Sequence, residues 1–235
     1  MTDSALRELA DDPSSRKRFF KMLGGAGAVS AAGVILAACG DDDDTAASGS
    51  PASSGSGAAA SEMDVKSDLD ILNYALTLEY LEAEFYAKVI DSGLVKDKAV
   101  VEIAKKFGQS EQEHVEALAA TIEKMGGKPV AAPETKFEQT LDKGLKTVLQ
   151  TAATVENLGA AAYLGQAAKI KSKEVLAAAL AIHSVEARHA AALNILVGRG
   201  FGDGKGGLEG ALPDGPFAKP MDDKAVLAAV KPFLA

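Results

Sequence analysis

Residues 181–189, which read Ala-Ile-His-Ser-Val-Glu-Ala-Arg-His, decide how the rest of the chain is interpreted. On an α-helix, Glu186 and His189 leave from neighbouring positions on one face, because residues three apart lie almost one turn from each other. The other residues on this face are apolar: Val175, Ala179, Ile182, Ala190, Leu193 and Val197. The face is therefore expected to be buried, with a carboxylate in its middle. Such a carboxylate needs a partner or a metal ion, since ionised groups are costly to remove from water.

The same spacing occurs earlier, at Glu111 and His114, again on an apolar helical face. The chain has three histidines, and two of them follow a glutamate by three residues. Two further segments each carry a glutamate followed by a tyrosine seven residues later, namely Glu79 with Tyr86 and Glu156 with Tyr163. The order Glu-x6-Tyr and then Glu-x-x-His thus occurs twice, which indicates a two-fold internal repeat.

Periodicity and composition predict an all-α fold. The chain is rich in alanine, has no tryptophan and lacks strand-like β-branched runs. Four helices are expected, over about residues 68–90, 98–125, 139–170 and 174–197, each with an inward glutamate near its midpoint. Ser67 is the expected N-cap of the first helix. Residues 128–138 contain two prolines and can cross the length of a helix, so the second and third helices are expected to be joined by a long crossover.

The expected domain organisation has four parts. Residues 1–38 are interpreted as a signal peptide, because Arg-Lys-Arg at 16–18 and Lys21 precede a mildly apolar run. Residues 39–63, with four consecutive aspartates and then mostly Ala, Ser and Gly, are expected to be a flexible tether. Residues 64–200 form the bundle, and residues 201–235 form a Gly-rich loop and a short C-terminal helix that packs on it. The net charge of −8 argues against nucleic acid as a partner.

Two resemblances in the first part of the chain imply export. The basic segment resembles a twin-arginine signal, with Lys17 where the second arginine usually stands, so the general secretory route is the alternative. Residues 36–39, Leu-Ala-Ala-Cys, resemble the lipobox of bacterial lipoproteins, which implies cleavage before Cys39 and a lipid on its thiol. The alternative is an uncleaved anchor or a chance buried cysteine. The expected location is periplasmic or at the cell envelope, with the lipid holding the chain on the membrane.

Four carboxylates and two imidazoles that meet at one level can hold two divalent cations. Four negative charges match the four positive charges of two such ions, which offsets the cost of burial. Oxygen ligands with two nitrogens favour iron or manganese, and open coordination positions would admit dioxygen or peroxide. The alternative is a bundle with buried acid–histidine pairs and no metal, but four unpaired acids at one level would repel one another.

At this point the chain resembles the ferritin-like di-iron carboxylate family over about residues 68–198, and residues 73–86 are similar to its exported branch, which includes desiccation-related proteins. The resemblance implies two iron or manganese ions. It assigns metal ligation to six residues, with Glu111 and Glu186 as the expected bridges: Glu79, Glu111, His114, Glu156, Glu186 and His189. Tyr86 and Tyr163 are implied to hydrogen-bond these ligands. Glu82, about 60° from Glu79 on the helix, is interpreted as a solvated flank residue, with a spare ligand as the alternative. His183 is interpreted as a residue that packs between helices or supports a ligand, with direct ligation as the alternative.

The resemblance implies an oxidoreductase in stress protection that reduces peroxide or dioxygen, or oxidises Fe(II). The alternatives are a metal-storage module and a non-catalytic desiccation-stress protein at the cell envelope. A homodimer is possible.

Overall fold

The computed structural model describes residues 62–200, 210–212 and 215–235. Every described residue belongs to one compact unit, Ala60–Ala235. The expected signal peptide, Cys39 and the tether up to residue 61 lie outside the described residues, as does the Gly-rich stretch 201–209. Among the described helices, none combines the length and the apolar character that a bilayer span requires.

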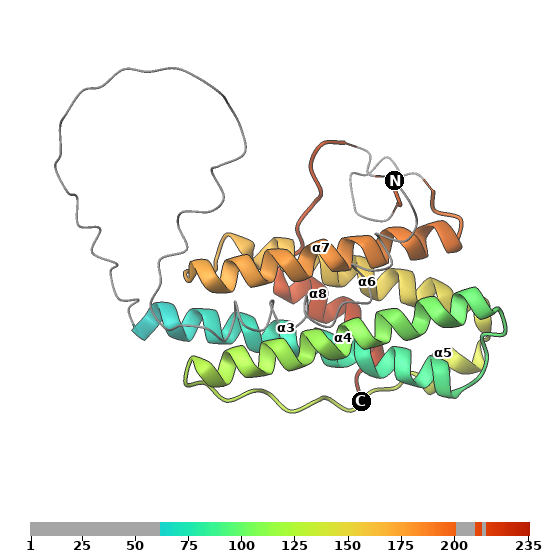
Figure 1. The fold of residues 1–235 in the computed structure, drawn as a ribbon, viewed down its shortest axis with the longest axis horizontal. Coiled ribbons are helices and arrows are strands. Elements are labelled where there is room, and N and C mark those ends of the chain that lie inside the picture. Colours follow the sequence, from blue (N-terminus) through green and yellow to red (C-terminus); the bar gives the residue numbers. More distant parts are fainter. Residues whose placement is uncertain (1–61, 201–209, 213–214) are drawn as a thin grey trace, which may run out of the picture. The chain divides into compact units, whose positions relative to one another are not determined.

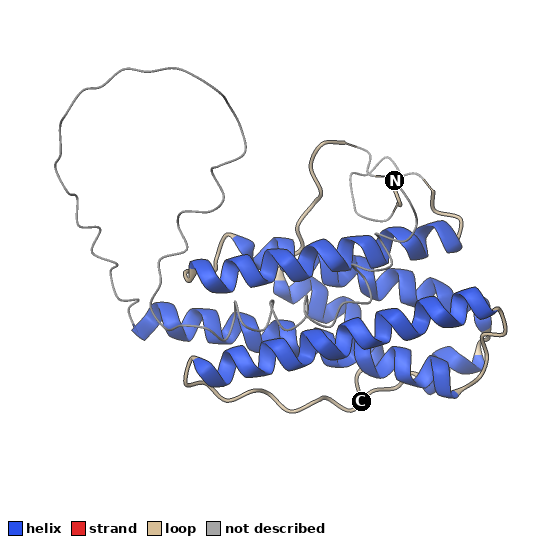
Figure 2. Cartoon of the chain, viewed as in Figure 1, coloured by secondary structure: helices blue, strands red, loops and turns tan. Residues whose placement is uncertain are grey.

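Four long helices form the bundle: α3 (Glu62–Asp91), α4 (Lys98–Lys124), α6 (Leu145–Ala167) and α7 (Lys173–Leu196). Helix α3 packs on α4, α6 packs on α7, and α3 also contacts α6. Helices α3 and α4 run antiparallel, as do α6 and α7, whereas α4 and α6 run in the same direction (Figure 1). The described part of the chain is helix and loop (Figure 2). The prediction of an all-α bundle is confirmed.

The helix starts follow local hydrogen-bonding chemistry. The Asp97 carboxylate accepts hydrogen bonds from two backbone N–H groups of the first turn of α4, and the Ser172 hydroxyl caps α7 in the same way. Asp68, buried on α3, accepts hydrogen bonds from the backbone N–H groups of Lys171 (2.8 Å) and Ser172 (2.7 Å). The turn between α6 and α7 is therefore tied to α3 by a buried charge.

One predicted helix start was wrong, and one predicted helix is divided in two. Helix α3 begins at Glu62, so Ser67 lies inside it and is not its N-cap; Glu62 and Asp64 place negative charge in the first turn, which the helix dipole favours. The third predicted helix is divided into α5 (Glu138–Asp142) and α6. Gly144, with φ of 87°, separates them, because a right-handed helix cannot continue through a positive φ.

The crossover between α4 and α5 runs along the bundle from one end to the other (Figure 1). It is held on α3 by Asn73, whose side-chain oxygen accepts a hydrogen bond of 2.8 Å from the backbone N–H of Val130. Thr135 pairs with Leu234 in an antiparallel bridge. Helix α8 (Asp223–Val230), followed by the short helix η1 (Lys231–Phe233), packs against α6.

The buried apolar side chains form two clusters. One contains Phe85, Phe137, Val148 and Leu193, and the other contains Leu72, Leu76, Leu118, Ile122 and Ile182. Along each of the four long helices, the central glutamate lies between residues of the first cluster and residues of the second. The acids therefore lie in a polar level enclosed by apolar packing on both sides.

Candidate metal centre

The structure brings together the six side chains that the repeat singled out. Each long helix contributes one glutamate, and all four glutamates are fully buried, at 0% exposure. Helices α4 and α7 also contribute His114 and His189, which are 9% and 7% exposed. The i, i+3 spacing on each of these two helices places acid and imidazole side by side, as the sequence predicted.

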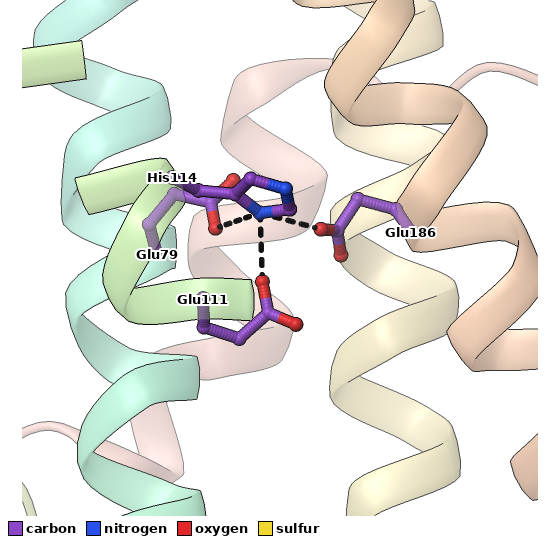
Figure 3. Close-up of side chains that lie close together, drawn as sticks. All are labelled: Glu79, Glu111, His114 and Glu186. Carbon is purple, nitrogen blue, oxygen red and sulfur yellow. Dashed lines mark hydrogen bonds and ion pairs between the residues drawn. The ribbon is translucent and has the colours of Figure 1, made fainter. Parts of the chain in front are cut away.

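The first group is centred on His114 (Figure 3). Its Nδ1 atom lies 2.8 Å from Oε2 of Glu111, 3.1 Å from Oε2 of Glu79 and 3.2 Å from Oε1 of Glu186. Three carboxylates from three helices therefore converge on a single nitrogen, which can carry only one proton. This crowding is costly for the metal-free protein and suits a cation.

The second group is centred on His189. Its Nδ1 atom lies 2.8 Å from Oε1 of Glu111 and 3.4 Å from Oε2 of Glu156. Glu186 completes the group, and within each group the potential ligand atoms all lie within 4.8 Å of one another. Glu111 and Glu186 belong to both groups, so these two carboxylates lie where a ligand shared by two ions would be.

Buried polar atoms that make no aligned hydrogen bond test whether these residues fit metal ions. Within the part of the chain that the structure describes, five atoms of the site are buried and make no aligned hydrogen bond: Oε1 of Glu111, Oε2 of Glu156, both carboxylate oxygens of Glu186 and Nδ1 of His189. Buried polar atoms are normally hydrogen-bonded, so five such atoms in one place need an explanation. Oxygen and imidazole donors at this spacing fit iron or manganese, and the residues present therefore fit the ions that the sequence implied.

Burial and mutual contacts shift the pKa values of the site. Burial raises the pKa of Glu79 to about 7, against the opposing contacts with His114 and the Tyr163 hydroxyl. Burial also raises the pKa values of Glu156 and Glu186, and neighbouring carboxylates add to the rise.

The pKa values of the two histidines and of Glu111 shift in the direction opposite to the one that burial favours. Burial favours the neutral form of Glu111, but hydrogen bonds and charge from His114 and His189 outweigh it and hold its pKa at about 2. Burial likewise disfavours protonated His189, yet Glu111 and Glu156 raise its pKa to about 9. The pKa of His114 is raised in the same way, chiefly by Glu79. Without metal, protons on the imidazoles therefore supply the positive charge that the acids need.

Each of the two tyrosines donates a hydrogen bond to the central glutamate of the facing helix. The Tyr86 hydroxyl on α3 donates to Oε1 of Glu156 on α6, and the Tyr163 hydroxyl on α6 donates to Oε1 of Glu79 on α3, both at 2.5 Å. Each tyrosine therefore fixes the glutamate of the facing helix and leaves that glutamate's second oxygen directed at a histidine.

Two further side chains near the site have packing roles. The Phe107 ring stacks on the His189 ring, with centroids 3.8 Å apart and planes 21° apart, so it fixes the orientation of that imidazole. His183 stands outside both groups, and its Nδ1 lies 2.9 Å from the backbone oxygen of Ala160 on α6. The interpretation of His183 as a packing residue is confirmed.

The interpretation of Glu82 was wrong. Its side chain is 3% exposed, so it is part of the core and is not a solvated flank residue. The physical reason lies on the facing helix, where Gly159 has no side chain: a Cβ atom placed there would meet Oε1 of Glu82 and Oε2 of Glu186, each at 2.9 Å. The sequence held one signal for this, because Gly159 follows Glu156 by three residues as Glu82 follows Glu79.

Comparisons with known proteins agree with the fold. The profile of the ferritin-like domain family matches residues 67–199, which include all four long helices and the six residues of the two groups. A solved structure of a ferritin-like, diiron-carboxylate protein from Bacillus anthracis is similar in fold, with a TM-score of 0.50 and 23% sequence identity. That similarity covers 58% of this chain and 99% of the other. Among curated proteins, none matches the chain significantly.

Proposed function

Because the chain belongs to the ferritin-like domain family, we propose that it is a di-metal carboxylate oxidoreductase that holds two iron or manganese ions. Its reaction is the reduction of peroxide or dioxygen, or the oxidation of Fe(II) as substrate. The observation that carries the proposal is the pair of four-residue groups that share Glu111 and Glu186, in which five buried atoms make no aligned hydrogen bond and several carboxylates crowd each imidazole. An acid cluster of this density has no counter-charge within the described residues other than the two histidines.

Each of the six residues has a place in this proposal. Glu79 and His114 would hold one ion and Glu156 and His189 the other, while Glu111 and Glu186, which belong to both groups, would serve both ions. When bound, the ions supply electrons and Lewis acidity for the reaction with oxygen species.

The chain's own groups control protons and water around that centre. The hydroxyl groups of Tyr86 and Tyr163 donate hydrogen bonds to Oε1 of Glu156 and Glu79. The second oxygen of each carboxylate faces a histidine, where a cation would replace the imidazole proton. The two apolar clusters on either side of the acids exclude bulk water and strengthen every electrostatic interaction between them. Phe107 keeps the imidazole of His189 in one orientation.

Metal analysis and turnover assays on one preparation test this function. We expect two ions per chain in protein purified from its own host, with turnover of peroxide, dioxygen or Fe(II). Glu186→Ala is expected to lose both, because it removes a carboxylate shared by both groups. Glu116→Ala, which removes an exposed acid of α4, is the matched control and should retain both. Two ions per chain without turnover of any of the three substrates would assign a binding role and refute the oxidoreductase.

We further propose that the protein is exported and anchored to a membrane by lipid on Cys39, in the periplasm or elsewhere at the cell envelope. The basic segment, the apolar run and the lipobox-like residues 36–39 support this. In the native host, labelled fatty acid should be incorporated into the wild type and not into Cys39→Ala. Equal labelling of the two proteins, or none in the wild type, contradicts the anchor.

A further inference from the structure

Glu82 is a fifth buried carboxylate at a centre that needs four to neutralise two divalent ions. Its side chain is 97% buried, and its Oε2 atom makes no hydrogen bond within the described residues. Burial raises the pKa of Glu82, and the negative charges of Glu186, Glu156 and Glu79 raise it further. A buried and unpartnered carboxylate oxygen is expensive, so its position beside the shared ligand needs a reason.

The internal repeat shows how this side chain is accommodated. Glu79 and Glu156 occupy equivalent positions in the two halves, so Glu82 is equivalent to Gly159. The structure places them against each other: the space that a Cβ of residue 159 would fill is bounded by Oε1 of Glu82 and Oε2 of Glu186, each 2.9 Å away. One half therefore supplies an extra carboxylate, and the other half supplies the space for it.

From this placement we infer that Glu82 is a seventh ligand of the di-metal centre, which it joins beside Glu186. The inference rests on the proposed di-metal function. Glu82 stands outside both four-residue groups, but the missing side chain at Gly159 lets its carboxylate lie against the same space as Oε2 of Glu186, which belongs to both groups.

Charge determines what the additional ligand does. Four carboxylates match two divalent ions, whereas five match one divalent and one trivalent ion. A fifth carboxylate at the centre would therefore favour retention of a trivalent ion, the state that an iron or manganese ion would reach on giving one electron to the dioxygen or peroxide of the proposed reaction. The substrate class is unchanged, and the consequence is a centre that keeps its metal through oxidation.

Co(II) titration of the metal-free full-length chain tests the ligand role independently of turnover. The comparison is between wild type, Glu82→Gln and Glu84→Gln, where Glu84 is an exposed acid two residues away on α3. We expect all three to bind two Co(II) per chain, with the affinity of Glu82→Gln for one ion lower by about 10- to 100-fold. The visible absorption of bound Co(II) should change in Glu82→Gln and stay unchanged in Glu84→Gln, because it reports the number of ligands. Circular dichroism checks that each variant is folded.

Glutamine separates ligation from simple hydrogen bonding. Its amide has the shape and the donor capacity of a protonated glutamic acid, so a Glu82 that only hydrogen-bonds to Glu186 would be replaced without loss. An affinity within threefold of wild type, or tighter, together with an unchanged Co(II) spectrum, overturns the inference and leaves the di-metal proposal standing. A wild-type chain that binds no Co(II) at the site overturns both.

Retention of a trivalent ion gives a second measurement. After loading with Fe(II) and oxidation, a chelator specific for ferric iron should extract iron from Glu82→Gln at least several-fold faster than from wild type. Equal extraction rates contradict the charge argument.

Discussion

Removal of metal is expected to make the stability of this protein fall as pH rises from 5 to 8. In the metal-free protein, burial raises the pKa of Glu79 from 4.5 to about 7. A carboxyl whose pKa is raised on folding contributes stability that is fully present below its unfolded pKa and is lost as pH rises through its folded pKa. The loss from Glu79 therefore occurs between about pH 4.5 and pH 7.

The other groups of the site act in the same direction over this window. Glu82, Glu156 and Glu186 also have raised pKa values. The pKa of His189 is raised to about 9, so its contribution is present below pH 6.5 and is lost as pH rises through 9. Only Glu111, whose pKa is lowered to about 2, has the opposite sign, and its contribution changes below pH 4.5, outside the window.

Glu79 alone sets the scale of the effect. A rise from 4.5 to about 7, at about 1.4 kcal/mol per pKa unit, corresponds to about 3 kcal/mol of unfolding free energy. For a folded unit of this size, 1 kcal/mol shifts the melting temperature by roughly 2–4 °C, so the expected fall is roughly 6–12 °C. The side chain is fully buried, so solvent screening does not reduce this figure.

Thermal unfolding of chelator-treated protein, followed by circular dichroism at constant ionic strength, measures this slope. The same protein saturated with Mn(II) is the control, and its slope should vanish or reverse, because bound metal requires deprotonated ligands. Glu79→Gln should make the metal-free slope shallower without removing it, because the other groups with raised pKa values remain, whereas Glu84→Gln should leave the slope unchanged. A metal-free melting temperature that is constant or rises between pH 5 and pH 8 refutes the reasoning.

Three further substitutions test individual contacts. Asp68→Ala removes the acceptor of two backbone N–H groups at the start of α7 and should cost about 3 kcal/mol in chemical denaturation; a cost below about 1 kcal/mol contradicts the tie. Gly165→Ala places a methyl group 1.8 Å from the backbone oxygen of Met221, so it should destabilise by about 1–3 kcal/mol and make the C-terminal segment more accessible to proteases; unchanged proteolysis counts against this. Tyr163→Phe removes the donor to Glu79 and should weaken Co(II) binding by about 10- to 100-fold; wild-type affinity would show that this hydrogen bond does not orient the ligand.

The bundle and the convergence of the six residues could be predicted from sequence because both depend on local periodicity. Residues three, four and seven apart share a helical face, so an acid flanked by apolar residues at these spacings must point inward. Central placement makes the acids meet at one level whatever the direction of each helix. The hydrogen bonds from each tyrosine to the glutamate of the other helix could not be predicted in this way. They depend on α3 and α6 facing each other, and the periodicity of a single helix does not show which helix it faces.

What sequence reasoning missed depends on contacts between helices. A helical wheel places Glu82 at the flank of α3, and only the missing side chain of Gly159 on α6 makes that flank an interior position. The break before α6 follows from the positive φ of Gly144, because a lone glycine within an apolar periodic segment does not reveal its backbone angle. Ser67 could cap a helix, but the acidic residues upstream extend α3 past it.

The two halves of the bundle repeat their acids and differ in what surrounds them, and this difference makes the two proposed metal positions inequivalent. The ring of Phe107, four residues before Glu111, stacks on His189, whereas the equivalent position in the other half is Ile182, which has no ring to stack. Glu82 has no counterpart either, because Gly159 stands in its place. Two ions bound at these positions would therefore differ in the charge and the packing around them. Strict two-fold symmetry would give the ions equal potentials, and these departures remove that equality while keeping the ligands of the repeat.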